Sequence, residues 1–366
     1  MRVLVVNAGS SSLKLRVLDH DDAILATADL EPDDEGRLGA FVTETEGIDA
    51  VGHRVVHGGS WTVPAVIDDE VLGSLHDLVP LAPLHQPAAL AGIDAVRRSL
   101  PHTPAVACFD TAFHTTLPAA AATYPLPQDW RERFGLRRHG FHGLSHAHAS
   151  QRAIAMVGGT AAHRTVTCHL GAGSSLAAVV GGRCVDTTMG FTPNEGLPMA
   201  TRSGSVDVGM LTWLLDAGLT AEELAEGLQL RSGLMGLAGT PDMQRVTEAA
   251  ATGDADAVLA VDVWLHRLCA GVAAMAAAAG GIDVLVLTGG IGERSATLRS
   301  QAAARLAWLG VGIDEDANVA ADGGDVEITG RVAPVRTLVV PAREDLEIAR
   351  GTRDALSGPA RGADSG

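Results

Sequence analysis

The chain is poor in positive charge and has almost no lysine. Its 366 residues include 27 Lys and Arg against 44 Asp and Glu, the formal net charge is −17, and Lys14 is the only lysine. So large an acidic excess argues against nucleic acid or an anionic membrane as the main partner. If the ligand is an anion, the chain must place its few cations locally, which directs attention to Lys14, Arg54 and Arg202.

Paired cysteines and long apolar runs are also missing. The four cysteines have no CxxC spacing and lie in apolar stretches, which indicates reduced core thiols and a cytoplasmic protein. The nearest approach to a membrane span, Ala270 to Gly281, is short and rich in Ala, so we expect no span. The N-terminus has one Arg before a short strand-like run, which is not typical of a signal peptide.

Apolar residues make up 46% of the chain, enough for the cores of two or three domains. VLVV, LKLRVLD and AILATADL indicate three successive strands at the N-terminus, and 105–109 indicates a short buried strand. Helical periodicity is present over 68–77, 87–100 and 144–157.

The opening segment VLVVNAGSSSLK recurs in outline. At 165–186, TVTCHLGAGSSLAAVVGGRCVD again has a strand, a Gly/Ser turn and two further strands, and 284–295 adds a third Gly-rich turn before a helix expected from Ala296. The weak repeat indicates two related domains. Small residues after a buried strand are typical of ordinary tight turns and also of phosphate-binding loops, although no segment matches GxxxxGK[ST] or completes GxGxxG.

Three ionisable residues stand at the edges of predicted elements or inside them. Arg54 lies within the otherwise apolar GHRVVHGG, where it is either salt-bridged or a fork for a carboxylate or phosphate. Asp110 ends the predicted strand in CFDTAFH. At this position it is either a ligand-binding group or the N-cap of a helix. Glu344 begins a predicted helix in PAREDLEIAR, where a first-turn acid also has a structural role.

HGFHGLSHAHA places His139, His142, His146 and His148 within ten residues. The spacing of His142 and His146 suits a metal site, but the Glu of HExxH is missing and the glycines disfavour a helix through His142. GLSHA resembles a degenerate nucleophile elbow. We favour a helix N-cap for Ser145 and a positioned imidazole for His142. The long segment 187–204, broken by Gly and Pro, has the length of a functional loop.

Together these motifs carry a family resemblance. VLVVNAGSSSLK, GHRVVHGG, PLHQPAAL, CFDTAFH, RRHGFHGLSH, HLGAGSS, MGFTPNEGLPMATRSG, SGLMGLAG, TGGIGE and PAREDLEIAR occur in this order over nearly the whole chain. The chain resembles the acetate kinases, the acetokinase group of the actin-like, Hsp70-like and sugar-kinase superfamily. The resemblance implies an α/β fold of two duplicated actin-like (RNase H-like) domains flanking a catalytic cleft. It also implies domains at 1–148, completed by a helix at 344–357, and at 149–343, with a tail at 358–366.

The resemblance also implies the reaction and its partners. Mg²⁺, or Mn²⁺, would support reversible transfer of a phosphoryl group from ATP to acetate, giving acetyl phosphate and ADP. The protein would be a cytoplasmic homodimer with no nucleic acid or membrane partner. Alternative expectations are propionate or another short-chain acid as acceptor, and a phosphoryl donor other than ATP. Less favoured readings are a chaperone or sensor on the same fold, for which the chain has no extra domain, and a metal hydrolase using the His cluster.

Site residues follow by matching motifs. The resemblance implies catalytic roles for Asp110, His142 and Arg202, metal binding near Asn7 and Glu344, and carboxylate binding by Arg54. It implies an apolar acyl pocket of Val56, Leu84, Phe141 and Pro193, and phosphate contacts from Ser10, Ser12 and Lys14. The implied nucleotide-binding residues are His169, Leu170, Gly171, Ala172, Gly173, Asp242, Met243, Gln244, Gly290, Ile291, Gly292, Glu293 and Arg294. Acetate is already ionised at neutral pH, so we interpret Asp110 as an organiser of Mg²⁺, His142 or an arginine rather than as a base.

Several positions depart from the family pattern. Ala172 and Arg294 stand where the family has Asn, Gln244 where it has Arg, Ser205 where it has Asp, and Arg343 where it has Asn. Nearly all of these changes fall on the nucleotide side, whereas the acyl side is intact. We therefore predict altered recognition of the phosphoryl donor.

Overall fold

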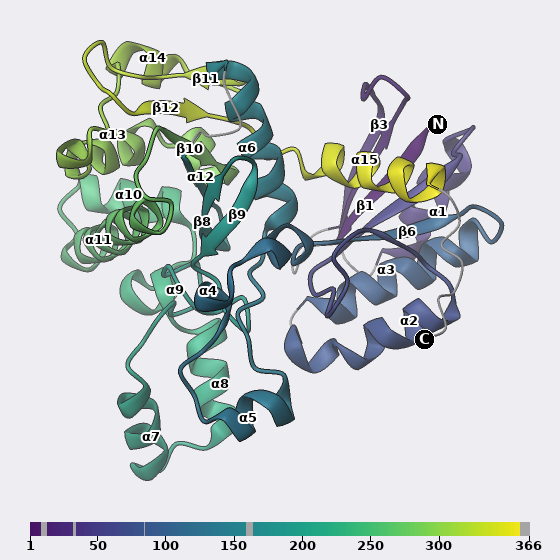
Figure 1. Cartoon of the computed structure of the whole chain (residues 1–366), viewed down its shortest axis with the longest axis horizontal. Coiled ribbons are helices and arrows are strands. Elements are labelled where there is room, and N and C mark those ends of the chain that lie inside the picture. Colours follow the sequence, from purple (N-terminus) through teal and green to yellow (C-terminus); the bar gives the residue numbers. More distant parts are fainter. Residues whose placement is uncertain (9–12, 32–33, 84, 159–163, 359–366) are drawn as a thin grey trace. The chain divides into compact units, whose positions relative to one another are not determined.

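The structure is a computed structural model that describes residues 1–8, 13–31, 34–83, 85–158 and 164–358 (Figure 1). Ser10, Ser12, Leu84 and the tail residues 359–366 lie outside the described residues. The chain divides into two compact units. Unit 1 comprises Met1–Thr115 and Arg343–Gly366, and unit 2 comprises Thr116–Ala342.

Unit 1 is built on a six-stranded sheet in which three strands form an antiparallel meander and two more run parallel to its first strand. The parallel strands are buried along almost their whole length, as apolar strands covered on both faces are. The order across the sheet is β3 (Ile24–Leu30), β2 (Leu13–Leu18), β1 (Val3–Ala8), β4 (Ala50–Val55), β6 (Ala105–Phe109) and β5 (Ala65–Val66).

Unit 2 repeats this plan. Its first three strands again form an antiparallel meander, two further strands run parallel to the first, and a short sixth strand is antiparallel at the edge. The equivalent order confirms the sequence repeat and the expected α/β class with duplicated domains. The order is β9 (Arg183–Thr187), β8 (Ser174–Val180), β7 (Arg164–Leu170), β10 (Val284–Thr288), β12 (Arg336–Val339) and β11 (Val326–Glu327).

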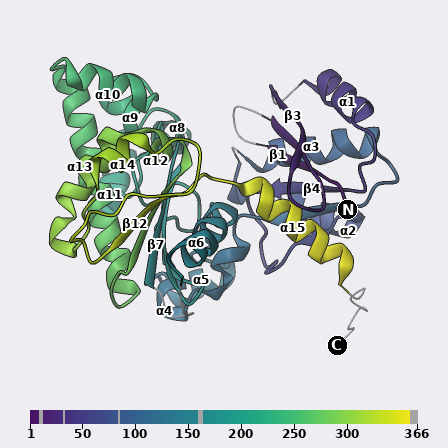
Figure 2. The same ribbon diagram turned by 90° about the horizontal axis from the view of Figure 1, so that it is seen from above.

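Two helices explain where the chain divides (Figure 2). Helix α6 (Gly143–Val157) packs against β7 and β10 of unit 2, and α15 (Glu344–Ser357) packs against β1, β4 and β6 of unit 1. Glycine at position 52 permits the close approach of α15, because a Cβ there would lie 2.3 Å from Thr352 Oγ1. The domain boundaries expected from the resemblance, and the cleft between the domains, stay predictions.

The predicted helices and the short predicted strand are present. Asp68 caps α2 by accepting a hydrogen bond from Val71 N over 2.8 Å. The remaining elements of unit 1, with the 3-10 turn that leads out of it, are α1 (Glu35–Glu44), α2 (Asp69–Asp77), η1 (Val79–Leu81), α3 (Gln86–Ser99) and η2 (Ala112–Thr116). Those of unit 2 are α4 (Ala119–Ala122), α5 (Gln128–Phe134), α7 (Val208–Asp216), α8 (Ala221–Leu230), α9 (Gly233–Ala238), α10 (Met243–Ala251), α11 (Ala255–Ala278), α12 (Gly289–Arg294), α13 (Ala296–Arg305), η3 (Ala307–Leu309) and α14 (Glu315–Ala320).

Helix α11 corrects the expectation that no segment could span a bilayer. The helix has 24 residues and is apolar enough to cross a membrane by length and composition, because it begins well before the apolar run seen in the sequence. Its inner face nevertheless belongs to the core of unit 2, where Trp264, Leu265 and Leu268 are buried. The core helix of a globular domain has the same composition, so this helix is weak evidence for a membrane span.

The third Gly-rich segment is also not the turn we expected. Residues Gly289–Arg294 form α12, a short helix that starts directly after β10. Gly289 has φ +79°, and a Cβ there would lie 2.7 Å from Leu170 O, so only glycine fits this close junction between strand and helix.

Candidate functional site

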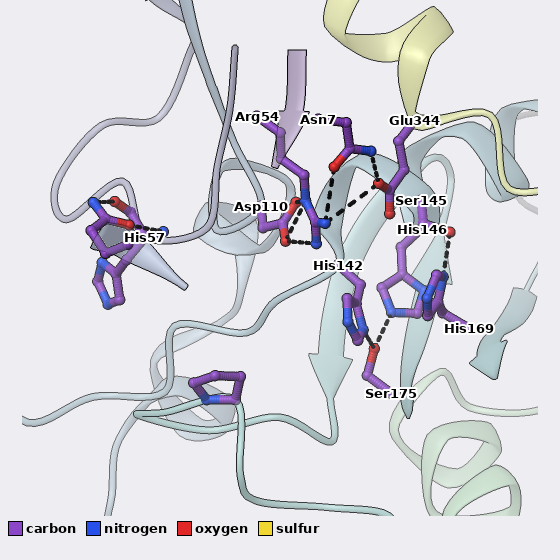
Figure 3. Close-up of polar contacts among 12 residues, drawn as sticks. Asn7, Arg54, His57, Asp110, His142, Ser145, His146, His169, Ser175 and Glu344 are labelled. Atoms are coloured by element: carbon purple, nitrogen blue, oxygen red, sulfur yellow. Dashed lines mark hydrogen bonds and ion pairs between the residues drawn. The ribbon is translucent and has the colours of Figure 1, made fainter. Parts of the chain in front are cut away.

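In unit 1, Arg54 and Asp110 form a buried bidentate ion pair (Figure 3). The parallel strands β4 and β6 bring them together, and Arg54 Nε and Nη2 donate to the Asp110 carboxylate, the shortest contact being 2.6 Å from Nη2 to Oδ2. Burial works against the charged form of Arg54, but the carboxylates of Asp110 and Glu344 outweigh it and raise the pKa of Arg54. Asp110 thus holds the guanidinium of Arg54, and its predicted catalytic role stays a prediction.

Asn7 and Glu344 extend this cluster from two other elements. Asn7, near the end of β1, accepts from Arg54 Nη1 over 3.2 Å and donates through Nδ2 to Glu344 Oε2 over 2.7 Å. Glu344 is the first residue of α15, and its Oε2 lies 3.7 Å from Arg54 Nη1. These contacts among the described residues use three of the five N–H groups of Arg54. One hydrogen on each of Nη1 and Nη2 makes no hydrogen bond within the described part of the chain.

The other unit 1 candidates lie nearby in the sequence, with different exposure. Val56 follows β4 and is 2% exposed. Lys14, on β2, is paired in register with Asn7 and has an exposed side chain. Leu84, Ser10 and Ser12 lie outside the described residues, so their predicted roles stay predictions.

In unit 2, His142 is held on three sides. Its Nδ1 lies 2.9 Å from Ser175 Oγ, and its ring stacks on that of His169 with centroids 4.3 Å apart. A Cβ on Gly173 would lie 3.1 Å from both Cε1 and Nε2 of His142, so this glycine makes room for the imidazole. His142 itself occupies the N-cap position of α6 with φ +56°.

Ser175 connects His142 to a second imidazole (Figure 3). Its hydroxyl lies 2.8 Å from His146 Nε2, and His146 Nδ1 lies 2.8 Å from Thr167 Oγ1. A serine hydroxyl has one hydrogen, so it can donate to only one of the two rings, and the other ring must donate its own N–H. His142 and His146 thus share a serine. Among the residues that the structure describes, no group of three or more His, Cys, Asp or Glu is placed to hold a metal.

Ser145 corrects another expectation. It lies inside α6, buried, and its hydroxyl bonds to His169 Nδ1 over 2.8 Å. The N-cap that we favoured for it was wrong, because the helix begins earlier, after His142. The hydroxyl instead orients the imidazole that stacks on His142.

Arg202 and His142 both lie close to Gly173. Its Nη1 donates to Pro193 O over 2.9 Å and lies 3.8 Å from where a Cβ on Gly173 would be. The backbone of segment 187–204 therefore brings a guanidinium close to the imidazole of His142. Phe141, 1% exposed, lies immediately before that histidine.

The predicted nucleotide loops lie at the ends of β7 and β10. Between β7 and β8, Gly171 N donates to Gly173 O, and Ala172 O accepts from Ala200 N. A side chain on Gly290 would meet nothing within 4 Å, so the surface there is open. His169 and Leu170 end β7, and Gly290, Ile291, Gly292, Glu293 and Arg294 belong to α12.

The third predicted loop has structural partners of its own. Asp242 caps α10 by accepting from Gln244 N over 2.9 Å, and Met243 is buried. Gln244 Nε2 donates to Glu248 Oε1 over 2.9 Å on the same helix. The side chain that replaces the family's Arg is thus directed along its own helix.

Two polar groups in unit 2 escaped the sequence analysis. Buried Arg299 donates to the carbonyl oxygens of Gly292 and Glu293 over 3.0 and 2.6 Å, and so supports α12. Burial lowers the pKa of Arg299. Glu195 is bound by Arg138 and by the hydroxyl of Tyr124. The only signals in the sequence were that Glu195 lies in FTPNEG beside Pro193 and that Arg138 precedes HGFHG.

The chain is similar to acetate and propionate kinases along nearly its whole length. A model of the acetokinase family matches residues 34–350. The acetate kinase of Synechococcus sp. (strain JA-2-3B'a(2-13)) is 48% identical over 323 residues, which is 87% of this chain and 80% of that protein. The crystal structure of Porphyromonas gingivalis acetate kinase matches with a TM-score of 0.88 at 36% identity, covering 97% of this chain and 99% of that one. A propionate kinase from Francisella tularensis subsp. tularensis SCHU S4 matches with a TM-score of 0.90 at 34% identity, covering 96% and 99%.

Proposed function

The chain belongs to the acetokinase family, and we propose that it transfers the γ-phosphoryl group of ATP to acetate, giving acetyl phosphate and ADP, and also catalyses the reverse reaction. It is thus a phosphotransferase with a carboxyl group as acceptor. Besides family membership, the observation that supports this proposal is Arg54, a guanidinium that a buried carboxylate holds and that has two N–H groups to which no described residue is hydrogen-bonded.

The residue that binds the acetate carboxylate belongs to unit 1 in this proposal. Arg54 binds the acetate carboxylate through Nη1 and Nη2, while Asp110 and Asn7 hold the guanidinium in place. Val56, with the predicted pocket residues Leu84, Phe141 and Pro193, receives the methyl group. An acetate oxygen then attacks the γ-phosphorus as the bond from that phosphorus to the bridging oxygen of ADP breaks. No proton has to move, because acetate is ionised at neutral pH.

His142 and Arg202 stabilise the transferring group. Charge in phosphoryl transfer is spread over the equatorial oxygens, so catalysis depends on positioning and on fixed positive or hydrogen-bonding groups. Both side chains lie against Gly173, which supports a common target for them. The loop at 169–173, the loop at 242–244 and α12 bind the nucleotide in this scheme, with Lys14, Ser10 and Ser12 on the phosphates.

A divalent cation fits the oxygen donors of unit 1. Mg²⁺ usually takes one or two carboxylates and fills its shell with water and substrate phosphates. Glu344, 8% exposed, offers a carboxylate of this kind, and Asn7 orients it. When bound, Mg²⁺, or Mn²⁺ in its place, would neutralise charge on the phosphate oxygens.

Propionate is the second candidate acceptor, because the similar solved structures include both an acetate and a propionate kinase. One methylene changes specificity by only roughly 10–200-fold in an apolar pocket. Hydroxamate formation from acetate, propionate and butyrate with ATP, GTP or pyrophosphate tests the proposal. We expect acetate with ATP to give the fastest product. Failure of all three acids with every donor would contradict the proposed function.

We further propose that the protein works as a homodimer in the cytoplasm. Helix α7 has no buried residue, and Val208 and Trp213 on it are 76% and 65% exposed, so an apolar surface of unit 2 is available to a second copy. All four cysteines are free thiols, in keeping with a reducing compartment. Sedimentation of the wild type and of Trp213→Glu tests the dimer, since the charged variant should be monomeric.

A further inference from the structure

Tyr124, Arg138 and Glu195 form a polar cluster in unit 2, called here the loop clamp. Tyr124 Oη donates to Glu195 Oε2 over 2.5 Å, and Arg138 Nη2 donates to Glu195 Oε1 over 2.8 Å. The Arg138 guanidinium also lies over the Tyr124 ring, 5.5 Å from its centroid. Burial, and then the neighbouring Glu195 carboxylate, raise the pKa of Tyr124, so its hydroxyl stays protonated and donates.

The loop clamp holds the backbone at the start of segment 187–204. Arg138 Nη1 donates to the carbonyl oxygens of Thr188 and Met189 over 3.2 and 3.0 Å. Phe191 N donates to Tyr124 Oη over 2.9 Å. A Cβ at position 190 would lie 1.8 Å from Glu195 Oε2, so the carboxylate closes directly over a glycine. Each clamp residue therefore contacts the loop or belongs to it.

The clamped backbone is continuous with both side chains that we place at the transferring phosphoryl group. Gly190 O accepts from the backbone N–H groups of His139 and Gly140, the two residues that lead into Phe141 and His142. Further along the same loop, Pro193 O accepts from Arg202 Nη1. Pro193 lies two residues before Glu195.

We propose that Tyr124, Arg138 and Glu195 are positioning residues that set the relative placement of His142 and Arg202, an inference that rests on the proposed function. None of the three has to touch substrate for this role. Loosening the clamp should lower kcat, because a small misplacement of a transition-state group costs rate even when binding is kept. The nucleotide KM should change little.

Tyr124→Phe and Glu195→Gln test the inference with minimal change of shape. We expect kcat to fall about ten-fold or more, with the KM for ATP within about two-fold of wild type. In Tyr124→Phe the Phe191 amide loses its acceptor and should exchange its hydrogen faster. Asp283→Asn is the matched control: it removes charge from the bidentate Arg164–Asp283 pair of the same unit, and should lower Tm without changing kcat.

Arg138→Ala adds a rescue experiment. Guanidinium ion added at low concentration should restore part of its kcat and leave wild type and Asp283→Asn unchanged. If wild type is active and kcat of the soluble clamp variants stays within about two-fold of it, the inference is wrong and the cluster is only structural. If wild type itself makes no acetyl phosphate, the proposed function fails instead. In that case, unchanged exchange at the Phe191 amide in Tyr124→Phe would still contradict the clamp.

Discussion

Arg54 Nη2 and Asp110 Oδ2 lie 2.6 Å apart, and the two side chains are 12% and 1% exposed. The buried Asp110 carboxylate thus occupies one edge of the Arg54 guanidinium. We assign this guanidinium to binding of the substrate carboxylate. The pair holds the guanidinium in one orientation, so that its remaining N–H groups point in a defined direction. Removal of Arg54 or of Asp110 should therefore have one effect on the stability of the protein and a separate effect on substrate binding.

Arg54→Ala should raise the KM for acetate far more than that for ATP, because only the acyl side loses a ligand. It should also destabilise the protein by about 3–5 kcal/mol, since it leaves the Asp110 carboxylate buried without its cation. Steady-state kinetics with each substrate varied, and thermal unfolding, measure the two effects. The double variant Arg54→Ala/Asp110→Ala should recover stability but not acetate binding. An unchanged acetate KM in Arg54→Ala would refute the assignment.

Val56→Ala should improve propionate relative to acetate by a factor on the order of ten, because removal of the two γ-methyl groups makes room for one additional methylene of the substrate. The ratio of kcat/KM for the two acids measures this. Val55→Ala is the matched control, since the neighbouring valine is equally buried and packs in the core of unit 1. If both variants leave the ratio unchanged, the acyl pocket lies elsewhere.

The phosphoryl donor should be recognised weakly at its base and ribose. The side chain of Ala172 can offer no hydrogen bond, Gln244 bonds to Glu248, and Arg294 adds an exposed cation that suits a phosphate. Each lost neutral hydrogen bond costs roughly 0.5–1.5 kcal/mol. We expect a small preference for ATP over GTP and measurable use of pyrophosphate.

Comparison of kcat/KM for the three donors at fixed Mg²⁺ and acetate decides this prediction. Ala172→Asn and Arg294→Asn restore the family pattern and should increase the preference for ATP. A strong wild-type preference for ATP, with no activity on pyrophosphate, would leave an ordinary ATP-dependent enzyme and overturn the prediction.

Ser175→Ala should lower kcat by about ten-fold or more while the KM values change little, because His142 loses the hydroxyl that orients its ring. Ser150→Ala is the control, since Ser150 is also a buried serine but, among the described residues, its hydroxyl bonds only to the carbonyl oxygen of Ala147 in α6. The dependence of kcat on pH should shift in Ser175→Ala and stay unchanged in Ser150→Ala. Equal kinetics in both variants would show that Ser175 does not orient His142.

Stability should fall at acid pH partly through His53. Burial lowers its pKa from 6.5 to about 3, and among the described residues its Nε2 has no hydrogen-bond partner. As the pH falls, His53 is protonated in the unfolded chain before it is protonated in the folded protein. Its contribution to the stability of the fold is therefore present above pH 6.5 and is lost as the pH falls from there toward about 3. Between about pH 7.5 and about pH 5.5 the loss is about 1.4 kcal/mol. In denaturant titrations, the loss of stability of His53→Gln between these two pH values should be smaller than that of wild type by this amount. An unchanged pH dependence would exclude His53 as a source of the acid destabilisation.

Local patterns were enough to predict much of the fold. The apolar runs that become β1, β7 and β10, and the periodicity of α2, α3 and α6, depend on neighbouring residues, so they are visible in the sequence. The repeat of strand, Gly/Ser turn and strand predicted two related domains, and the structure shows them as two sheets of equivalent strand order.

The individual candidates for the site were also visible in the sequence, because a charged residue inside an apolar strand and a histidine beside glycine stand out in it. The sequence by itself determined the family, the two sheets and the residue types available for phosphoryl transfer. The family resemblance placed Asn7 and Glu344 near one metal, but the hydrogen bond between them, across 337 positions, was decided only by the tertiary structure, because α15 returns to pack on the sheet of unit 1. The same holds for Ser145 on His169, for Arg299 beneath α12 and for Glu195 between Tyr124 and Arg138. Except for Arg299, which lies within seven residues of Gly292 and Glu293, these contacts join residues distant in the chain, and which polar groups meet in space follows from packing that no local spacing encodes.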